Sequence, residues 1–178
     1  MYLRLAIILV PYLCMTHATV AAGQTLSGGS IHFYGAAVNA ACAIDAQSLH
    51  QSIMMDQVKT GTFSAIGSWA AATPFSIKLE NCDDTISQFT SVVFTGATDP
   101  RDPQVFMAGF GADAAKGVGL GIFDDKGHVI TPNSTPLAKT ALADGENNLL
   151  FTAKYRAVSS NIIAGDASAA VNFSVIYQ

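Results

Sequence analysis

The 178-residue chain is poor in charge. Charged residues make up only 12% of it, whereas half of its residues are hydrophobic. The formal net charge is −4, and the few lysines and arginines form no basic patch, which argues against nucleic-acid binding. A monomer with so little charge would be unusual in water. The composition therefore favours a surface in permanent contact with other protein.

Long hydrophobic runs are also scarce. The one apolar run, residues 5–13, is interrupted by Pro11 and is too short to span a membrane. It follows Arg4 and precedes the small residues 20–22, which is the anatomy of a secretory signal peptide. We expect residues 1–22 to be removed and residues 23–178 to form a soluble mature chain, with a buried N-terminal helix as the alternative.

Cysteine is limited to three residues. Cys14 would leave with the signal peptide, so Cys42 and Cys82 would remain. Two cysteines in an exported chain most simply form one disulfide, although two free buried thiols are the alternative. Closing a loop of about 40 residues would stabilise the fold by about 4 kcal/mol.

Catalytic and metal-binding patterns are missing as well. His32, His50 and His128 lie far apart, without metal-ligand spacing. The chain contains neither a nucleophile elbow nor a P-loop, and the acidic spacing of a calcium loop is absent around residues 124–125. The glycines of residues 117–121 alternate within a strand pattern and predict places of close approach. We therefore expect no cofactor, no metal and no enzymatic activity.

What the sequence does contain is strand signal. Apolar residues alternate with polar or small ones, which predicts strands. The predicted strands cover residues 29–35, 73–80, 91–95, 118–122, 128–130, 149–157 and 169–177. Turn-forming residues predict connections at 98–103, 124–127, 131–134 and 144–148, residues 39–48 look strand-like but irregular, and residues 61–72 have no assignment. Short strands separated by turns predict an all-β sandwich.

The two ends of the mature chain are unusual. Near its start, Gly29, Ile31, Phe33 and Gly35 share one parity of a strand, although a terminal strand is usually poorly ordered. At the other end the chain stops inside a strand. An immunoglobulin-like sandwich normally has seven strands, so a chain ending on the sixth leaves an open edge and an uncovered core. A spare strand and a missing strand suggest head-to-tail transfer between molecules, which builds a filament.

At four places the sequence resembles the pilin subunits of chaperone–usher fimbriae, and it is closest to the type 1 major pilin and its small minor-pilin relative. These places are residues 28–35, residues 38–45, the second cysteine within residues 79–82, and the ending Tyr177-Gln178. The resemblance covers the whole mature chain.

The resemblance implies an incomplete immunoglobulin-like β-sandwich of six strands that lacks its last strand. Residues 23–38 would form a donor-strand extension and residues 39–178 the pilin domain. By resemblance, the donor residues are Gly29, Ile31, Phe33 and Gly35, the groove-facing residues are Val171, Phe173, Val175 and Tyr177, and the disulfide joins Cys42 to Cys82. Gly165 and Tyr177 match the C-terminal pattern that the chaperone recognises in the family.

The resemblance also implies partners: a periplasmic chaperone, an outer-membrane usher and neighbouring subunits in an extracellular fimbria that supports adhesion. A minor, anchoring or terminating pilin is an alternative, although Ile31 and Phe33 favour a subunit with neighbours on both sides. An adhesin would need an extra lectin domain, for which residues 23–41 are too few. A secreted enzyme on a sandwich fold is disfavoured by the missing catalytic set.

Overall fold

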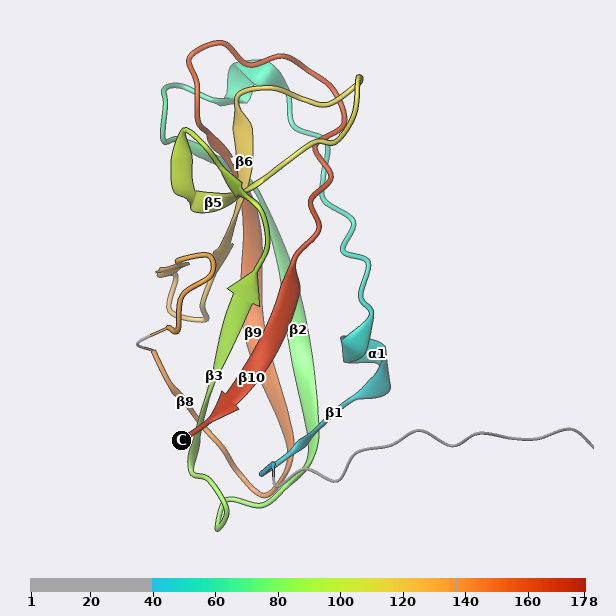
Figure 1. Ribbon diagram of the computed structural model, residues 1–178, viewed down its shortest axis with the longest axis vertical. Helices are drawn as coiled ribbons and strands as arrows, with labels where there is room; N and C mark the ends of the chain where they lie inside the picture. Colours follow the sequence, from blue (N-terminus) through green and yellow to red (C-terminus); the bar gives the residue numbers. More distant parts are fainter. Residues whose placement is uncertain (1–39, 137) are drawn as a thin grey trace, which may run out of the picture. The chain divides into compact units, whose positions relative to one another are not determined.

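The computed structural model of the protein describes residues 40–136 and 138–178, which fold into two antiparallel sheets (Figure 1). The larger sheet has the order β1-β2-β9-β6-β5-β4, with β7 paired to β6, and the smaller has the order β10-β3-β8. The strands are β1 (Ala43–Ile44), β2 (Trp69–Cys82), β3 (Phe89–Thr95), β4 (Thr98–Asp99), β5 (Asp102–Met107), β6 (Val118–Phe123), β7 (Val129–Ile130), β8 (Thr140–Ala141), β9 (Gly145–Ala157) and β10 (Asn172–Tyr177). A helical turn α1 (Ala46–Leu49) and a 3-10 turn η1 (Thr60–Thr62) complete the elements.

The predicted all-β, incomplete immunoglobulin-like sandwich is confirmed. Within the described residues, the strands of six residues or more are β2, β3, β5, β6, β9 and β10. Their number is the six that the resemblance implies, although β5 was not predicted as a strand and the predicted strand 128–130 is only the two-residue β7. The others are two-residue pieces. None of the described helices is both long and apolar enough to cross a membrane.

The two longest strands, β2 and β9, pair with each other within the larger sheet. Their registered pairs include Phe75 with Phe151 and Ile77 with Leu149, so apolar side chains of both strands share one face. That face packs against β3 and β10 of the smaller sheet, and the core lies between the two sheets.

The glycines of β6 sit where neighbouring side chains approach closely, as predicted. A β-carbon on Gly119 would collide with the side chain of Val105, and one on Gly121 would collide with the ring of Trp69. These glycines leave room for the side chains of Val105 in β5 and Trp69 in β2 to lie against β6, within the same sheet.

Three parts of the sequence-based assignment were wrong. Residues 98–103 were expected to form a connection, but they contain β4 and the start of β5; Pro103 is tolerated there because β5 pairs with β6 only at Phe106 and Met107. Residues 145–148 belong to β9 rather than to a turn. Of the stretch 39–48, which was expected to be strand-like but irregular, the described residues 40–48 contain only the two-residue β1, after which the Asp45 side chain accepts a hydrogen bond from the Gln47 N–H and caps α1.

The predicted turn between β6 and β7 is confirmed. Gly127 has a φ of 82°, and its N–H donates to the Asp124 carbonyl over 3.1 Å. The Asp124 carboxylate accepts from the backbone N–H of Lys126 at 3.0 Å and of His128 at 2.7 Å, so its charge is used to hold the turn.

Candidate functional site: an open apolar groove beside the last strand

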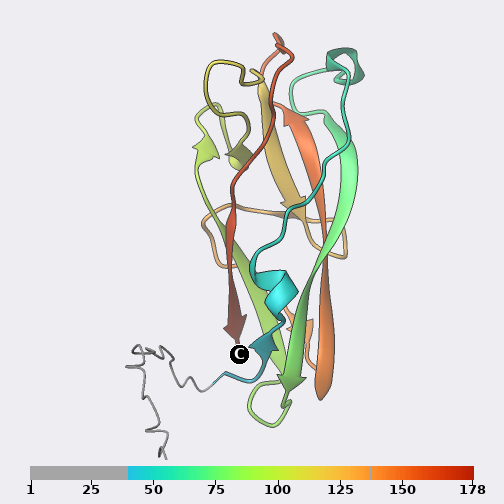
Figure 2. The ribbon, with the colours of Figure 1, turned by 90° about the vertical axis from the view of Figure 1, so that its right-hand side faces the viewer.

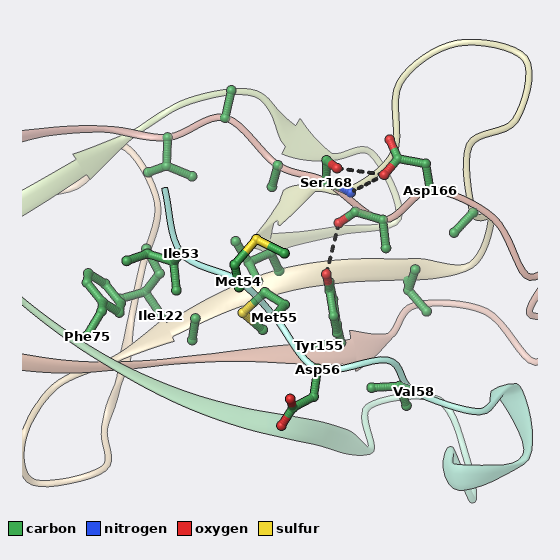
Figure 3. Close-up of a pocket in the computed structure, with 18 of the residues that line it drawn as sticks. Ile53, Met54, Met55, Asp56, Val58, Phe75, Ile122, Tyr155, Asp166 and Ser168 are labelled. Carbon is green, nitrogen blue, oxygen red and sulfur yellow. Dashed lines mark hydrogen bonds between the residues drawn. The ribbon is translucent and has the colours of Figure 1, made fainter. Parts of the chain in front are cut away.

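A groove of about 950 Å³ runs along one edge of the sandwich (Figure 3). One wall is the stretch 48–60 and the other is the stretch 162–173, which leads into β10. Figure 2 shows the first stretch rising from α1 beside the segment that enters β10. The two walls are far apart in sequence, so only the folded sandwich brings them together.

The floor of the groove is aromatic and aliphatic. Phe75 lies with its ring centroid 5.4 Å from Phe151 and 6.2 Å from Phe94, and it is only partly buried. Ile77 and Ile122 line the same space. Ile77 and Ile122 are already buried, so the apolar surface of the floor that a further strand could cover belongs to Phe75.

The β10 wall has an unpaired edge. Within the described residues, β10 pairs with β3 alone, for example Phe173 with Phe94 and Val175 with Val92. The side chains predicted to face the groove pack against the core but remain only partly buried; they are Val171, Phe173, Val175 and Tyr177. Val171 and Phe173 line the groove itself, whereas Val175 and Tyr177 do not.

The opposite wall was not recognised from the sequence. Residues 50–58 form no strand and make no backbone–backbone hydrogen bonds to other described residues. Their apolar side chains show no period of two, which is why the pattern gave no signal. Figure 3 shows Ile53, Met54 and Met55 along this wall.

Side chains rather than a ladder hold this wall to β2. The Ser48 hydroxyl accepts a hydrogen bond from the Lys78 N–H at 2.9 Å, and the Gln51 amide donates to the Ser76 carbonyl at 2.8 Å. These two contacts satisfy two backbone groups on the edge of β2 and use no backbone group of residues 50–58.

At one end the groove is closed by polar contacts. The Tyr155 hydroxyl donates to the Ala167 carbonyl at 3.2 Å, and the Ser168 hydroxyl donates to the Asp166 carboxylate at 2.6 Å (Figure 3). Burial, together with the nearby charge of Asp166, raises the pKa of Tyr155 above its ordinary value. The neutral hydroxyl therefore persists as a donor at physiological pH.

Gly165 lies in this end of the groove wall. A β-carbon there would stand 2.7 Å from the Ala115 nitrogen and 2.8 Å from the Ala114 carbonyl carbon. The Ala115 N–H donates to the Asp166 carbonyl at 2.8 Å, so two chain segments cross in contact. Glycine is needed here to place the wall; its expected role in chaperone recognition stays a prediction.

The other end of the fold is tied by the disulfide and by Tyr177. The predicted Cys42–Cys82 disulfide is present. The Tyr177 hydroxyl donates to the Cys42 carbonyl at 3.1 Å, which joins the end of β10 to the start of the pilin-like body. Burial raises the pKa of Tyr177, and the hydrogen bond to Cys42 offsets part of that rise.

The expected donor residues Gly29, Ile31, Phe33 and Gly35 lie outside the described residues, as does the predicted signal peptide. The structure therefore describes the acceptor side of the expected exchange.

One cluster of carboxylates among the described residues, at Asp83, Asp84 and Asp144, lies outside the residues that line the groove. It holds two loops together, because the Asp144 carboxylate accepts a hydrogen bond from the Asp84 N–H at 3.0 Å.

Comparison with known proteins decides the family. The family model described as "Fimbrial protein" matches residues 31–178. The chain belongs to the fimbrial protein family. Over 168 residues it is 39% identical to the fimbrial subunit type 1 of Salmonella typhimurium, covering 90% of each chain. It is 35% identical to the type-1 fimbrial protein A chain of Escherichia coli K12, covering 98% of this chain and 97% of that relative.

Solved structures of pilus subunits have the same fold. The P pilus rod subunit PapA superposes with a TM-score of 0.65 at 26% identity, covering 78% of this pilin and all of PapA. A subunit of a chaperone–usher pilus, from a study of rod uncoiling, gives a TM-score of 0.66 at 26% identity and covers 89% of this pilin. The protein is therefore a structural subunit of an extracellular chaperone–usher fimbria.

Proposed function

We propose that the groove accepts an extended strand from another polypeptide and that the pilin polymerises by donor-strand exchange. One observation carries this proposal: β10 presents an apolar face and an unpaired backbone edge to a groove whose opposite wall, residues 50–58, is also unpaired. A strand inserted between them would complete the hydrogen bonding of both walls and cover the aromatic floor.

The donor is the extension of residues 23–38 of a neighbouring subunit. Burying Ile31 and Phe33 would stabilise the joint by roughly 1.5–3 kcal/mol each. Each hydrogen bond of the new ladder adds about 0.5–1.5 kcal/mol. Gly35 lacks a side chain, which allows its backbone to approach a crowded part of the groove.

Before assembly, a periplasmic chaperone lends the missing strand, with Gly165 and Tyr177 among the residues that it recognises. An outer-membrane usher then exchanges the chaperone strand for the next donor. The signal peptide, residues 1–22, directs the chain to the periplasm and is then removed. Ile31 and Phe33 make the subunit a competent donor, which supports a position inside the filament rather than at its terminus.

Expression of the mature chain in the periplasm tests the need for a donated strand. Without a fimbrial chaperone the pilin should be degraded or aggregate, because its groove is uncovered. With the chaperone it should be recovered as a one-to-one complex. Equal recovery of soluble pilin from the periplasm with and without the chaperone would overturn the proposal.

Substitutions in the extension test the donor role. Gly35→Leu should abolish polymerisation yet preserve the chaperone complex, since only the donor strand is altered, and Ile31→Asp should do the same by placing a charge in an apolar groove. Ser30→Ala, on the opposite parity, is the matched control and should polymerise normally. Normal filament yield from Gly35→Leu, seen by electron microscopy, would contradict the assignment.

A further inference from the structure

Donor-strand exchange joins two subunits through a short connection. The donor strand ends at Gly35 and the described body begins at Ala40. The residues between them can span at most about 18 Å, at roughly 3.3–3.6 Å per residue. The 13-residue strand β9 alone is about 44 Å long at roughly 3.4 Å per residue. The body of the donor must therefore stand close to one end of the acceptor groove.

The direction of β10 selects which end. β10 runs from the stretch 162–168 toward the disulfide, and antiparallel pairing is the more stable arrangement for an added strand. A donor strand antiparallel to β10 places its C-terminal end, which leads to its own body, near residues 162–168. Figure 1 shows the loops 59–68, 108–117 and 158–166 together at this end, away from the C-terminus.

Each of these three loops exposes a large apolar side chain. Ile66 is 65% exposed, Phe110 is 49% exposed and Ile163 is 45% exposed. Ile163 also lines the groove, so this apolar surface is continuous with the proposed binding site. We call these three residues the loop end.

The donor body presents apolar side chains where its extension leaves it. The Asp83 N–H donates to the Ala41 carbonyl at 2.9 Å, which holds the loop 83–88 beside the first described residues. Ile86 in this loop is 51% exposed and the adjacent Phe89 is 42% exposed. We call these two residues the disulfide end.

We propose that the disulfide end of each donor packs onto the loop end of its acceptor, as a second interface between two copies of this chain. The short connection brings the two ends together, and water is excluded from Ile86 and Phe89 on one side and from the loop end on the other. The inference rests on the proposed donor-strand exchange.

Cross-linking in assembled filaments tests the interface. A variant with Ile86→Cys and Phe110→Cys carries two free thiols, since Cys42 and Cys82 are paired. Treatment with a short bismaleimide should give a ladder of covalent oligomers that survives heating in detergent. The control pairs Ile86→Cys with Leu150→Cys, which is 59% exposed but lies in mid-strand opposite Ser76, and it should give monomers only. Equal ladders, or no ladder from intact filaments of the first variant, would overturn the proposal.

If the cysteine variant does not assemble, side-chain footprinting of filaments without substitutions tests the same interface. Ile86 and Phe110 should lose most of their reactivity toward hydroxyl radicals between the chaperone complex and the filament. Unchanged reactivity of both would refute the second interface. A different result would show that the proposed donor-strand exchange is itself wrong. In that case the Gly35→Leu variant would still form filaments.

Discussion

β9 and β10 have the same sequence pattern and different surroundings. In β9, Leu149, Phe151 and Tyr155 alternate with outward-facing residues, and all three are buried. In β10, Phe173 and Val175 alternate in the same way, yet both are only partly buried. β9 lies between β2 and β6, whereas β10 has β3 on one side and the groove on the other.

This difference shows that an alternating pattern specifies which face of a strand is apolar but not what covers that face. In β9 the cover comes from the chain itself. In β10 the proposed cover comes from another molecule, so part of the free energy that stabilises this fold would be released only on assembly.

The largest expected effect is in the covered strand. Phe151→Ala should lower the free energy of unfolding by about 3–5 kcal/mol, because the ring contacts both Phe75 and Phe94 in the core. Denaturant unfolding of the refolded subunit, measured with and without a synthetic peptide of residues 23–38, should show this loss in both states. If Phe151→Ala lowered the free energy of unfolding only in the peptide-bound state, Phe151 would belong to the open groove. β9 and β10 would then not differ in what covers them.

Phe173→Ala tests the uncovered strand. This variant should lose roughly 1.5–3 kcal/mol of unfolding free energy with the peptide bound, because the ring is then fully buried. Without the peptide the loss should be clearly smaller. The same unfolding experiment measures both values. Equal losses in the two states would mean that the groove is not where the donor strand binds.

The packing of β6, which pairs with β9, can be tested at Gly119, on the sheet face opposite Tyr155. Gly119→Ala should cost about 1–3 kcal/mol, since the added methyl group would collide with the side chain of Val105. Gly61→Ala is the matched control, because the space around Gly61 is open, and its unfolding midpoint should not fall. A Gly119→Ala variant as stable as the parent would show that β5 can move away from β6.

The smallest expected effect is at the end of β10. Tyr177→Phe removes the hydrogen bond to the Cys42 carbonyl and should cost about 0.5–1.5 kcal/mol. Burial raises the pKa of Tyr177 in the folded state, so its contribution is present at neutral pH and is lost as the pH rises above its ordinary value of about 10. The free energy of unfolding should therefore decline less steeply with rising alkaline pH in Tyr177→Phe than in the parent. An unchanged slope would contradict this linkage.

Much of the fold was predictable because its strands alternate cleanly. The strands around Phe75, Phe151 and Phe173, and the hairpin turn at Gly127, follow directly from local patterns. β5 was not predictable, because the proline and aspartate residues just before it and at its start, Asp102 and Pro103, also favour turns. The wall of residues 50–58 carried no local signal, since it is defined by the groove beside it rather than by a strand of its own.

The sequence by itself determined the all-β class, the apolar face of each long strand and the two cysteines available for a disulfide, because these depend on residue type and on a period of two. Only the tertiary structure decided which apolar faces are covered. It brought the stretch 50–58 opposite β10, required glycine at position 165 through a chain crossing, and set the Tyr177 hydroxyl on the Cys42 carbonyl. Contacts between residues so distant in sequence arise from packing, which no local pattern encodes.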